Sequence, residues 1–406
     1  MIIQHIKRNC LNIGQIVLLG LLLTGCASAN GNEELKAAIE HSNRNLKNAT
    51  EAYQWNANNP RSIMPDGTVD FVKSRDWTSG FFPGCLWYMF EYTNDSIYLN
   101  QAIHYTSLIE EEKFNGKTHD MGFKMYCSFG NGYRLTGNPE YKQSLIQGAQ
   151  TLVTRFNPKI GCIRSWDHNS DKWQFPVIID NMMNLELIFW AFKETNDSAY
   201  YNIAVSHANR TLENHFRNDF SSFHVVDYDS LTGQVIQKNT HQGYSDNSSW
   251  SRGQAWALYG YTLCYRETND PHYLAQAQNI AEFIFNHQNL PGDLIPYWDY
   301  NAPNIPKEPR DASAAAITAS ALVELSTFSS ADQSTKYLLY ANKILDVLSS
   351  KEYFNYENSA NHFLLKHSTG NKPTNSEVDC PIIYADYYYL EVLGRMTNLL
   401  QKNPSE

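Results

Sequence analysis

The turn motif that decides the fold of this chain is EYTNDSIY at residues 91–98, with further copies RLTGNPEY (134–141), KETNDSAY (193–200) and RETNDPHY (266–273). After each threonine, Asn, Asp, Gly or Pro stops a helix and turns the chain, and a new apolar run follows. Weaker copies lie at Thr327 and Thr397. A helix–turn–helix unit that recurs six times predicts an all-α toroid of helical hairpins.

Side chains that can do chemistry recur at a fixed distance before these turns. Counting back fifteen or sixteen residues from successive turn threonines reaches Trp77, Asp120, Asp180, Arg252 and Asp311. Sixteen helical residues span roughly 24 Å, so the five side chains are expected at the N-terminal ends of equivalent helices. In a ring of hairpins those ends meet at one rim, which predicts a single cavity there.

Hydrophobic patterns separate the expected inner helices from the outer ones. The stretches 181–194 and 253–267 are apolar nearly all round, so they must be covered on every side and are expected inside the ring. The stretch 273–287 has apolar residues at spacings of three and four, as an outer helix should. Residues 221–237 alternate like strands around a turn, which predicts one small β excursion.

Composition limits the classes of function. The chain has 406 residues, and the repeat covers nearly all of them, which favours one large domain. A net charge of −10 without a basic run argues against nucleic acid as a partner, although a local arginine can still hold a carboxylate. Aromatic residues make up 13% of the chain, and they suit either sugar stacking or a large helical core.

The N-terminus carries a secretion signal. Lys7 and Arg8 precede the apolar run 16–23, and the sequence LTGC at 23–26 resembles a bacterial lipobox, in which Cys26 becomes the lipidated first residue. The apolar run is too short to span a membrane. We therefore expect a protein that is anchored to the membrane by its lipid, in the bacterial cell envelope, facing the periplasm or the outer surface.

This signal sets the expected domain boundaries. Residues 1–25 are the lipoprotein signal peptide, 26–34 are the lipidated cysteine and a small, polar tether, and 35–398 are the catalytic domain. The five cysteines beyond Cys26 are scattered and form no CxxC pair, so we expect buried free thiols and no metal or cofactor.

Asp180 is the first candidate for acid–base chemistry. It lies in FPVIIDNMMNLEL (175–187), between isoleucines and methionines. Apolar surroundings disfavour a charged carboxyl and raise its pKa, and a neutral carboxylic acid can then act as a general acid. The alternative is an ordinary N-cap aspartate that satisfies the first amides of its helix. The sequence leaves both open.

Asp120 is the second candidate, next to His119 in KTHDMGFKMYCSF (117–129). Two carboxyls in one aromatic cleft are the usual equipment for glycoside chemistry, although a helix cap is again the alternative. Arg252 begins an apolar inner helix, with Trp256 on the same face one turn later. An unpaired charge there is costly, so we expect Arg252 to hold a carboxylate through two parallel bonds.

These motifs together resemble the unsaturated glucuronyl hydrolases, glycoside hydrolase family 88. The resemblance extends over roughly residues 50 to 396 and is carried by RDWTSGFFPGCLWYMF (75–90), THDMGF (118–123), IIDNMMNLELIFWA (178–191), THQGYSDNSSWSRGQAWALYGY (240–261), RDASAAAI (310–317) and IIYADYYYLEVL (382–393). It implies an (α/α)₆ barrel, in agreement with the hairpin repeat.

The resemblance also implies a reaction. The family removes the C4=C5 unsaturated uronic acid that polysaccharide lyases leave at the non-reducing end of glycosaminoglycan-type oligosaccharides. It does so by hydrating the double bond, a vinyl ether: protonation at C4 gives oxocarbenium character at C5, water adds there, and the resulting hemiketal opens. No metal or cofactor is implied.

Matched residue by residue, the resemblance makes Asp180 the general acid/base and Asp120 the second essential aspartate. It places the following residues around the substrate: Trp77, Phe81, His119, His224, Thr240, His241, Gln242, Trp250, Arg252 and Trp256. Family members that take sulfated substrates carry serines and a lysine in a loop before the last helix. In LLKHSTGNKPTNSEVD (364–379), Ser368 and Lys372 match, but Leu365 stands where a further serine is expected, which leaves the sulfate preference open.

Three alternatives share some of these features. A hydrolase of unsaturated rhamnogalacturonyl groups would use the same ring on pectin fragments. A surface lipoprotein that only binds glycans would need the aromatics and Arg252, but not two aspartates in one register. A ring-shaped epimerase would use histidines, for which His119, His224 and His241 are the candidates. The sequence sets neither the glycan nor the oligomeric state.

Overall fold

The computed structural model describes residues 31–53, 55–357 and 361–402. The expected signal peptide and Cys26 lie outside these residues. Residues 31–34, which we expected in the tether, are already helical, and the last helix continues to Lys402 rather than ending the domain at 398. Among the described residues no helix is long and apolar enough to cross a bilayer.

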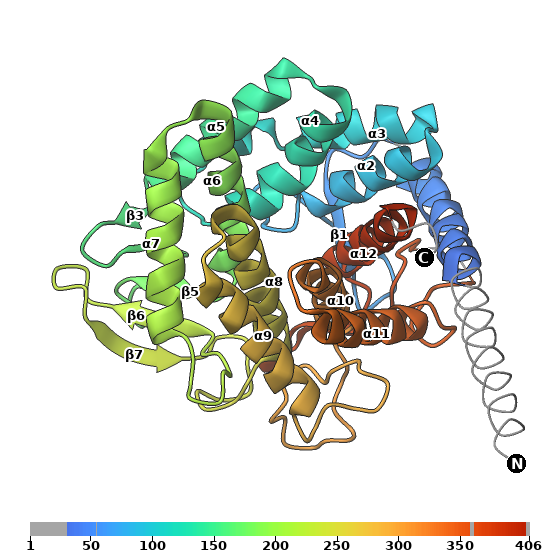
Figure 1. Ribbon diagram of the computed structural model, residues 1–406. Helices are drawn as coiled ribbons and strands as arrows, with labels where there is room; N and C mark the ends of the chain where they lie inside the picture. Colours follow the sequence, from blue (N-terminus) through green and yellow to red (C-terminus); the bar gives the residue numbers. More distant parts are fainter. Residues whose placement is uncertain (1–30, 54, 358–360, 403–406) are drawn as a thin grey trace, which may run out of the picture.

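Helices form a closed ring of hairpins, as the repeat predicts (Figure 1). The inner helices are α2 (Phe81–Thr93), η2 with α4 (Gly122–Gly130, Asn131–Thr136), α6 (Asn181–Thr195), α8 (Ser251–Thr268), α10 (Ala312–Ser326) and α12 (Ile383–Lys402). The outer helices are α3 (Ser96–Ser107), α5 (Pro139–Val153), α7 (Ser198–Asn214), α9 (Pro271–Asn286) and α11 (Ala331–Leu348). Helix α12 packs on both α10 and α2, which closes the ring.

The threonine turn depends on two local hydrogen bonds and one left-handed residue, as the turn between α6 and α7 shows. The Thr195 hydroxyl donates to the Ala191 carbonyl at 2.7 Å in the last turn of α6. Asn196 adopts φ 57°, a left-handed conformation that asparagine tolerates. Asp197 then accepts the Ala199 N–H at 2.9 Å and caps the next helix. The motif therefore contains both the stop signal and the start signal.

The sixth copy of the motif is an exception. Thr397 makes the same bond to the Leu393 carbonyl, at 2.8 Å, but it lies inside α12, so the prediction of a turn there was wrong. The outer partner of α12 is instead the helix formed by residues 31–53. This N-terminal helix is fixed to α3 by the Tyr98 hydroxyl, which donates to Asn43 Oδ1 at 2.6 Å.

Burial follows the expected division into inner and outer helices. In α8 nearly every residue is buried, whereas in α9 burial recurs at spacings of three and four. All five cysteines in the described part of the chain are buried and free, as expected: Cys85, Cys127, Cys162, Cys264 and Cys380.

The β structure is more extensive than one excursion. The expected hairpin exists as β6 (Val225–Tyr228) and β7 (Val235–Asn239), extended to three strands by β5 (Pro176–Ile178). Three further two-stranded sheets pair β1 (Asn59–Ile63) with β2 (Val69–Val72), β3 (Phe156–Asn157) with β4 (Cys162–Ile163), and β8 (Ser368–Asn371) with β9 (Ser376–Cys380). All four sheets lie in connections that lead into the N-terminal end of an inner helix, so they build up the same end of the barrel.

Candidate active site

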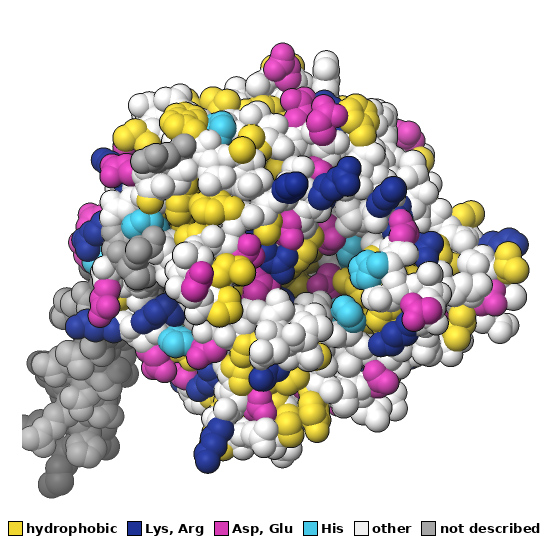
Figure 2. Space-filling model, turned by 180° about the vertical axis from the view of Figure 1, so that it is seen from behind, with side chains coloured by type: hydrophobic (Ala, Val, Ile, Leu, Met, Phe, Trp, Pro, Cys, Tyr) yellow, Lys and Arg dark blue, Asp and Glu magenta, His cyan; other side chains and the backbone are white. Residues whose placement is uncertain are grey.

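The N-terminal ends of the inner helices surround one cavity, as the register predicted. It has a volume of about 320 Å³, and four of the five register residues line it: Trp77, Asp120, Asp180 and Arg252. The fifth, Asp311, lies behind Arg252 and bonds to it at 2.8 Å. Figure 2 shows a hollow near the centre of one face of the molecule, with acidic, basic and histidine side chains around it.

Asp180 stands at the N-cap position of α6, yet its side chain caps nothing. The carboxyl accepts no backbone amide of the helix, and its Oδ2 is buried without a hydrogen-bond partner in the described structure. Burial raises the pKa of Asp180 to about 7, the charge of Arg252 opposes this rise, and that of Asp120 adds to it. The capping alternative is therefore wrong for Asp180, and the carboxyl is available to hold and release a proton.

His224 lies behind Asp180 as a neutral imidazole. Its Nδ1 accepts the backbone N–H groups of His241 and Gln242, both at 3.1 Å, so its proton is on Nε2. Burial and the nearby cationic groups hold the pKa of His224 well below its usual range. Nε2 lies 3.6 Å from Asp180 Oδ2, a neighbour of the carboxyl without a direct hydrogen bond.

Asp120 has a more polar setting than Asp180. Its Oδ2 accepts the Thr118 hydroxyl at 2.6 Å, and its Oδ1 lies 3.2 Å from His119 Nε2. Burial lowers the pKa of His119 even though Asp120 opposes this, which favours a neutral imidazole beside the carboxylate. The side chain of Asp120 is 18% exposed, compared with 10% for Asp180, so the two carboxyls differ in solvation.

The π-helix η2 follows directly after Asp120. Asn184 on α6 accepts the N–H of Gly122 at 2.8 Å and that of Phe123 at 3.2 Å. A Cβ on Gly122 would lie 2.7 Å from the Asn184 backbone, so only glycine allows this approach. The contact ties the helix that carries Asp180 to the segment that carries Asp120.

Arg252 corrects one expectation. Its guanidinium, expected to be free for a ligand, is engaged within the protein. Nη1 bonds to Asp311 at 2.8 Å and to the Thr369 carbonyl at 2.6 Å, while Nη2 bonds to the Gly370 carbonyl at 2.5 Å. Only Nε is buried without a partner in the described structure. Arg252 therefore holds the β8–β9 hairpin first, and it cannot offer a substrate two parallel terminal N–H groups without releasing that hairpin.

The far side of the same hairpin is held by a second arginine. Arg61 bonds through Nε and Nη2 to both oxygens of Glu377, each at 2.7 Å, and through Nη1 to Asp76 at 2.7 Å. Asp76 directly precedes Trp77. Arg61 therefore connects the hairpin to the aromatic wall of the cavity.

The remaining predicted site residues fall into three groups. His119, His241 and Gln242 line the cavity together with the register residues. Four others are buried behind them and support the wall without lining it: Phe81, His224, Trp250 and Trp256. Thr240 is half-buried and does not line the cavity either. Ser368 is fully buried and Lys372 lies outside the lining. Contrary to the expectation for these two residues, neither faces the cavity.

Sequence reasoning missed 12 of the 19 residues that line the cavity. These residues are Arg61, Lys117, Thr118, Trp166, His168, Ile178, Gly370, Asn371, Thr374, Ser376, Glu377 and Tyr384. Lys117 and Thr118 adjoin His119 and could have been found from that motif. Most of the others come from connecting segments without a register, although the aromatic run around Trp166 was a usable signal. In the described part of the chain, no group of three or more His, Cys, Asp or Glu residues could hold a metal ion.

The chain is similar to known glycoside hydrolases. The family model described as Glycosyl Hydrolase Family 88 matches residues 48–267. An unsaturated glucuronyl hydrolase from Formosa agariphila is 54% identical over 353 residues, which cover 86% of this chain and 88% of that protein. An unsaturated chondroitin disaccharide hydrolase from Streptococcus agalactiae is 34% identical over 80% of this chain and 82% of its own length.

Solved structures agree with the sequence comparison. An unsaturated glucuronyl hydrolase described as specific for heparin superposes with a TM-score of 0.88 at 48% identity, covering 91% of this chain and 98% of its own. The unsaturated glucuronyl hydrolase of Bacillus sp. GL1, described as responsible for the degradation of glycosaminoglycan, gives a TM-score of 0.82 at 29% identity, covering 90% and 96%.

Proposed function

The chain belongs to glycosyl hydrolase family 88, and from that premise we propose how its residues remove a C4=C5 unsaturated uronic acid from the non-reducing end of lyase-generated oligosaccharides. In this proposal the chain acts as its relatives are named, as an unsaturated glucuronyl hydrolase, and it cleaves glycosaminoglycan-type fragments by hydrating the double bond. The relatives named above are hydrolases of this kind, so we set aside the alternatives of a pectin enzyme, an epimerase and a non-catalytic binder.

Asp180 is the proton donor in this proposal. Its carboxylic acid protonates C4, the π electrons form the new C–H bond, and the ring oxygen stabilises the positive charge that develops at C5. A water molecule attacks C5 and returns a proton to the Asp180 carboxylate. The hemiketal that results opens, and the glycosidic link breaks without attack at the anomeric carbon.

One observation supports this role above the others: the Asp180 carboxyl caps no helix and has a pKa of about 7 because it is buried. A general acid is most effective when its pKa lies near the operating pH. His224 presents a neutral Nε2–H toward this carboxyl, which suits a group that must be neutral before the reaction and charged briefly during it.

Asp120 and Arg252 act on the substrate and on its surroundings. Asp120, oriented by Thr118 and His119, lies close enough for its charge to raise the pKa of Asp180, and it can accept a hydroxyl of the sugar. Arg252 supplies positive charge at the base of the cavity and keeps the β8–β9 hairpin over it. Nε of Arg252 remains for the substrate carboxylate, and Lys117 and His241 add positive or polar groups to the lining.

The assay for this function is the loss of ultraviolet absorbance when the enzyme hydrates the conjugated double bond. Purified protein should remove the absorbance of lyase digests and leave the same disaccharides unaffected once their double bond has been reduced. The Asp180→Asn variant serves as the matched control. Persistence of the absorbance with every digest in a panel of sulfated and unsulfated glycosaminoglycans would refute the function.

The side chains of the β8–β9 hairpin lead to a proposal about sulfate preference, which the same panel of digests tests. Toward the cavity the hairpin presents Asn371, Thr374, Ser376 and Glu377, and Arg61 neutralises Glu377. We therefore propose that this wall takes an unsulfated edge of the second sugar. Faster turnover of a digest sulfated at that edge would contradict this proposal.

We also propose that Cys26 carries a lipid that holds the enzyme at the cell envelope. The basic residues, the apolar run and the LTGC sequence support this. Expression of the full chain in a bacterial host, followed by membrane fractionation, tests it. The protein should move from the membrane fraction to the soluble fraction in Cys26→Ser, and equal distribution of the two forms would oppose the anchor.

A further inference from the structure

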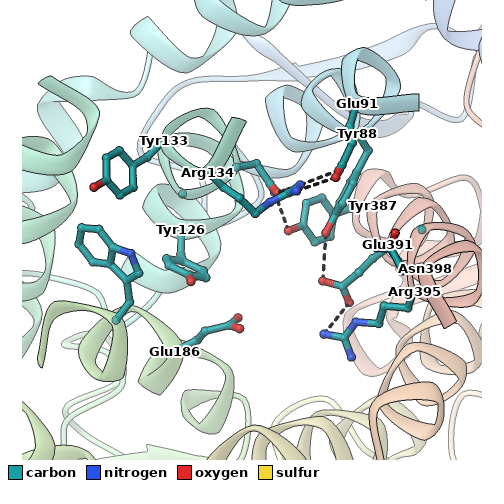
Figure 3. Close-up of a pocket in the computed structure, with 14 residues that line it drawn as sticks. Tyr88, Glu91, Tyr126, Tyr133, Arg134, Glu186, Tyr387, Glu391, Arg395 and Asn398 are labelled. Atoms are coloured by element: carbon teal, nitrogen blue, oxygen red, sulfur yellow. Dashed lines mark hydrogen bonds and ion pairs between the residues drawn. The ribbon is translucent and has the colours of Figure 1, made fainter. Parts of the chain in front are cut away.

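A second cavity lies at the opposite end of the barrel. Its lining comes from the middle and C-terminal parts of α2, α6 and α12 and from η2 with α4, whereas the active site lies at the N-terminal ends of the inner helices. The cavity has a volume of about 480 Å³, larger than the 320 Å³ of the active site, and the two share no residue. Figure 3 shows its side chains converging on a common space.

One wall of this cavity is aromatic. Trp190 packs edge-on against Tyr133 at 5.8 Å and at a tilt against Tyr126 at 6.3 Å, and all three rings are only partly buried. Figure 3 shows Tyr126 and Tyr133 on one side, with the carboxyl of Glu186 below them. Partly exposed rings of this kind can stack on the apolar face of a sugar or on an organic cation.

The opposite wall is polar, and its two arginines are already engaged. Arg134 makes two parallel bonds of 2.7 Å to the carboxylate of Glu91. Arg395 bonds to Glu324 at 2.8 Å and to the Tyr259 hydroxyl at 2.7 Å. These guanidinium groups have partners within the protein, so the cavity offers little to an anionic ligand.

Its carboxylates are not equally satisfied. Glu186 uses Oε1 for Arg266 at 2.6 Å, while Oε2 has no hydrogen-bond partner among the described residues. The side chain is 20% exposed, toward the cavity. Burial raises the pKa of Glu186, the charge of Arg266 opposes this rise, and the carboxyl of Glu391 adds to it, so a cationic ligand beside the free oxygen would stabilise the carboxylate form.

A metal ion does not suit this charge. No group of three or more His, Cys, Asp or Glu side chains in the described structure converges as metal ligands do. The acidic and aromatic groups lie at different places in the cavity. An organic cation can use both, with its ammonium near Glu186 and its ring against Trp190. The further acceptors around the cavity, including the Tyr126 hydroxyl and Asn398, suit the hydroxyl groups of a pyranose.

We propose that this cavity is a second saccharide site, which binds a hexosamine with a protonated amine through Glu186 and the face of Trp190. The N-acetylated hexosamine that the proposed reaction would release carries no ammonium, so it is the comparison ligand rather than the expected one; only this comparison rests on the proposed function. The binding chemistry itself depends on residues that the active site does not use.

Titration of the full chain with glucosamine, N-acetylglucosamine and glucuronate, at a pH where the amine is protonated, tests the proposal by calorimetry. We expect glucosamine to bind most tightly and glucuronate most weakly. Glu186→Gln should weaken glucosamine binding by about tenfold, the effect of one charge-assisted hydrogen bond, and leave N-acetylglucosamine nearly unchanged. Trp190→Ala should weaken the binding of both glucosamine and N-acetylglucosamine. Trp190→Phe should weaken it less, because a ring remains.

Two controls separate this site from the active site. Asp180→Asn should bind glucosamine as the unsubstituted protein does, and Trp190→Ala should hydrate unsaturated disaccharide at the normal rate. Glucosamine binding that disappears in Asp180→Asn but survives in Glu186→Gln would place the sugar in the active site and overturn the proposal. Equal affinity for all three sugars, or no saturable binding of glucosamine, would overturn it as well, whatever the hydration assay shows.

Discussion

The N-termini of α6 and α10 carry an aspartate in the same register, and the two carboxyls serve opposite purposes. Asp311 accepts the Ser313 N–H at 3.1 Å, caps α10, and pairs with Arg252 at 2.8 Å. Within the described part of the chain, Asp180 caps no helix and has no charged group in direct contact. Both are buried, so the difference comes from their partners: backbone amides and a guanidinium engage the Asp311 carboxyl, while Asp180 lacks them and burial raises its pKa to about 7.

The largest expected effect comes from removing the proton of Asp180. In Asp180→Asn the amide cannot protonate carbon, so kcat for hydration should fall by roughly 10²–10⁴, the usual contribution of general acid catalysis. The absorbance assay measures this, with circular dichroism to verify the fold. A variant that retains near-normal kcat would show that the uncapped carboxyl is not the acid.

Asp311→Asn should lower the free energy of unfolding, whereas Asp180→Asn lowers kcat. The amide can still accept the backbone N–H groups of α10, but Arg252 loses its charged partner while fully buried. Breaking a buried ion pair in this way costs about 3–5 kcal/mol. Urea unfolding followed by fluorescence measures the change, and a loss below about 1 kcal/mol would mean that the carbonyls of Thr369 and Gly370 satisfy the guanidinium alone.

Asp180→Asn should increase the stability of the protein at alkaline pH, whereas Asp311→Asn lowers it. The pKa of Asp180 is raised from 3.8 to about 7, so the folded state holds a proton that the unfolded state releases. Its contribution to stability is complete below the unfolded pKa and is lost as pH rises through about 7. At pH 8 the variant should therefore be more stable, by an amount on the order of 1–3 kcal/mol. Unfolding at pH 5 provides the matched control, where the gain should be smaller.

The pH dependence of the reaction should reveal the neighbours of Asp180. Because its acid form is required, kcat should decline as pH rises above about 7. Asp120→Asn removes a charge that raises the pKa of Asp180, so in the residual activity this decline should move to lower pH, by less than about one unit. A shift to higher pH would indicate that the two carboxyls do not interact as described.

The smallest effect is expected at the other support of the β8–β9 hairpin. Arg61 and Asp76 have side chains 21% exposed, unlike the buried pair of Arg252 and Asp311. Arg61→Met should therefore cost roughly 1 kcal/mol of stability and raise KM more than it lowers kcat. A double-mutant cycle of Arg61→Met with Glu377→Gln measures the coupling between these two side chains. If the two changes act independently, Arg61 does not support the hairpin through Glu377.

Sequence reasoning found the site where a repeat supplied a register. Trp77, Asp120, Asp180 and Arg252 were placed on one cavity because equal spacing before equal turns puts residues at equal heights on equivalent helices. It failed in the β8–β9 hairpin, where Ser368 faces the interior and the neighbouring Asn371 faces the cavity. A bulge between Ser368 and Thr369 changes the register there, and a short irregular hairpin has no long pattern to reveal such a shift.

The sequence by itself determined the ring, because the helix stop, the left-handed residue and the next N-cap all lie within five consecutive residues and depend on local bonds alone. It also determined that five functional positions share one end of the barrel. Only the tertiary structure decided which aspartate caps a helix and pairs with Arg252 and which is left uncapped as an acid, and that Arg252 is engaged by the hairpin before any substrate arrives. Those outcomes depend on groups up to 118 residues away, as with Arg252 and Gly370, and a carboxyl takes its pKa from whatever the fold packs beside it.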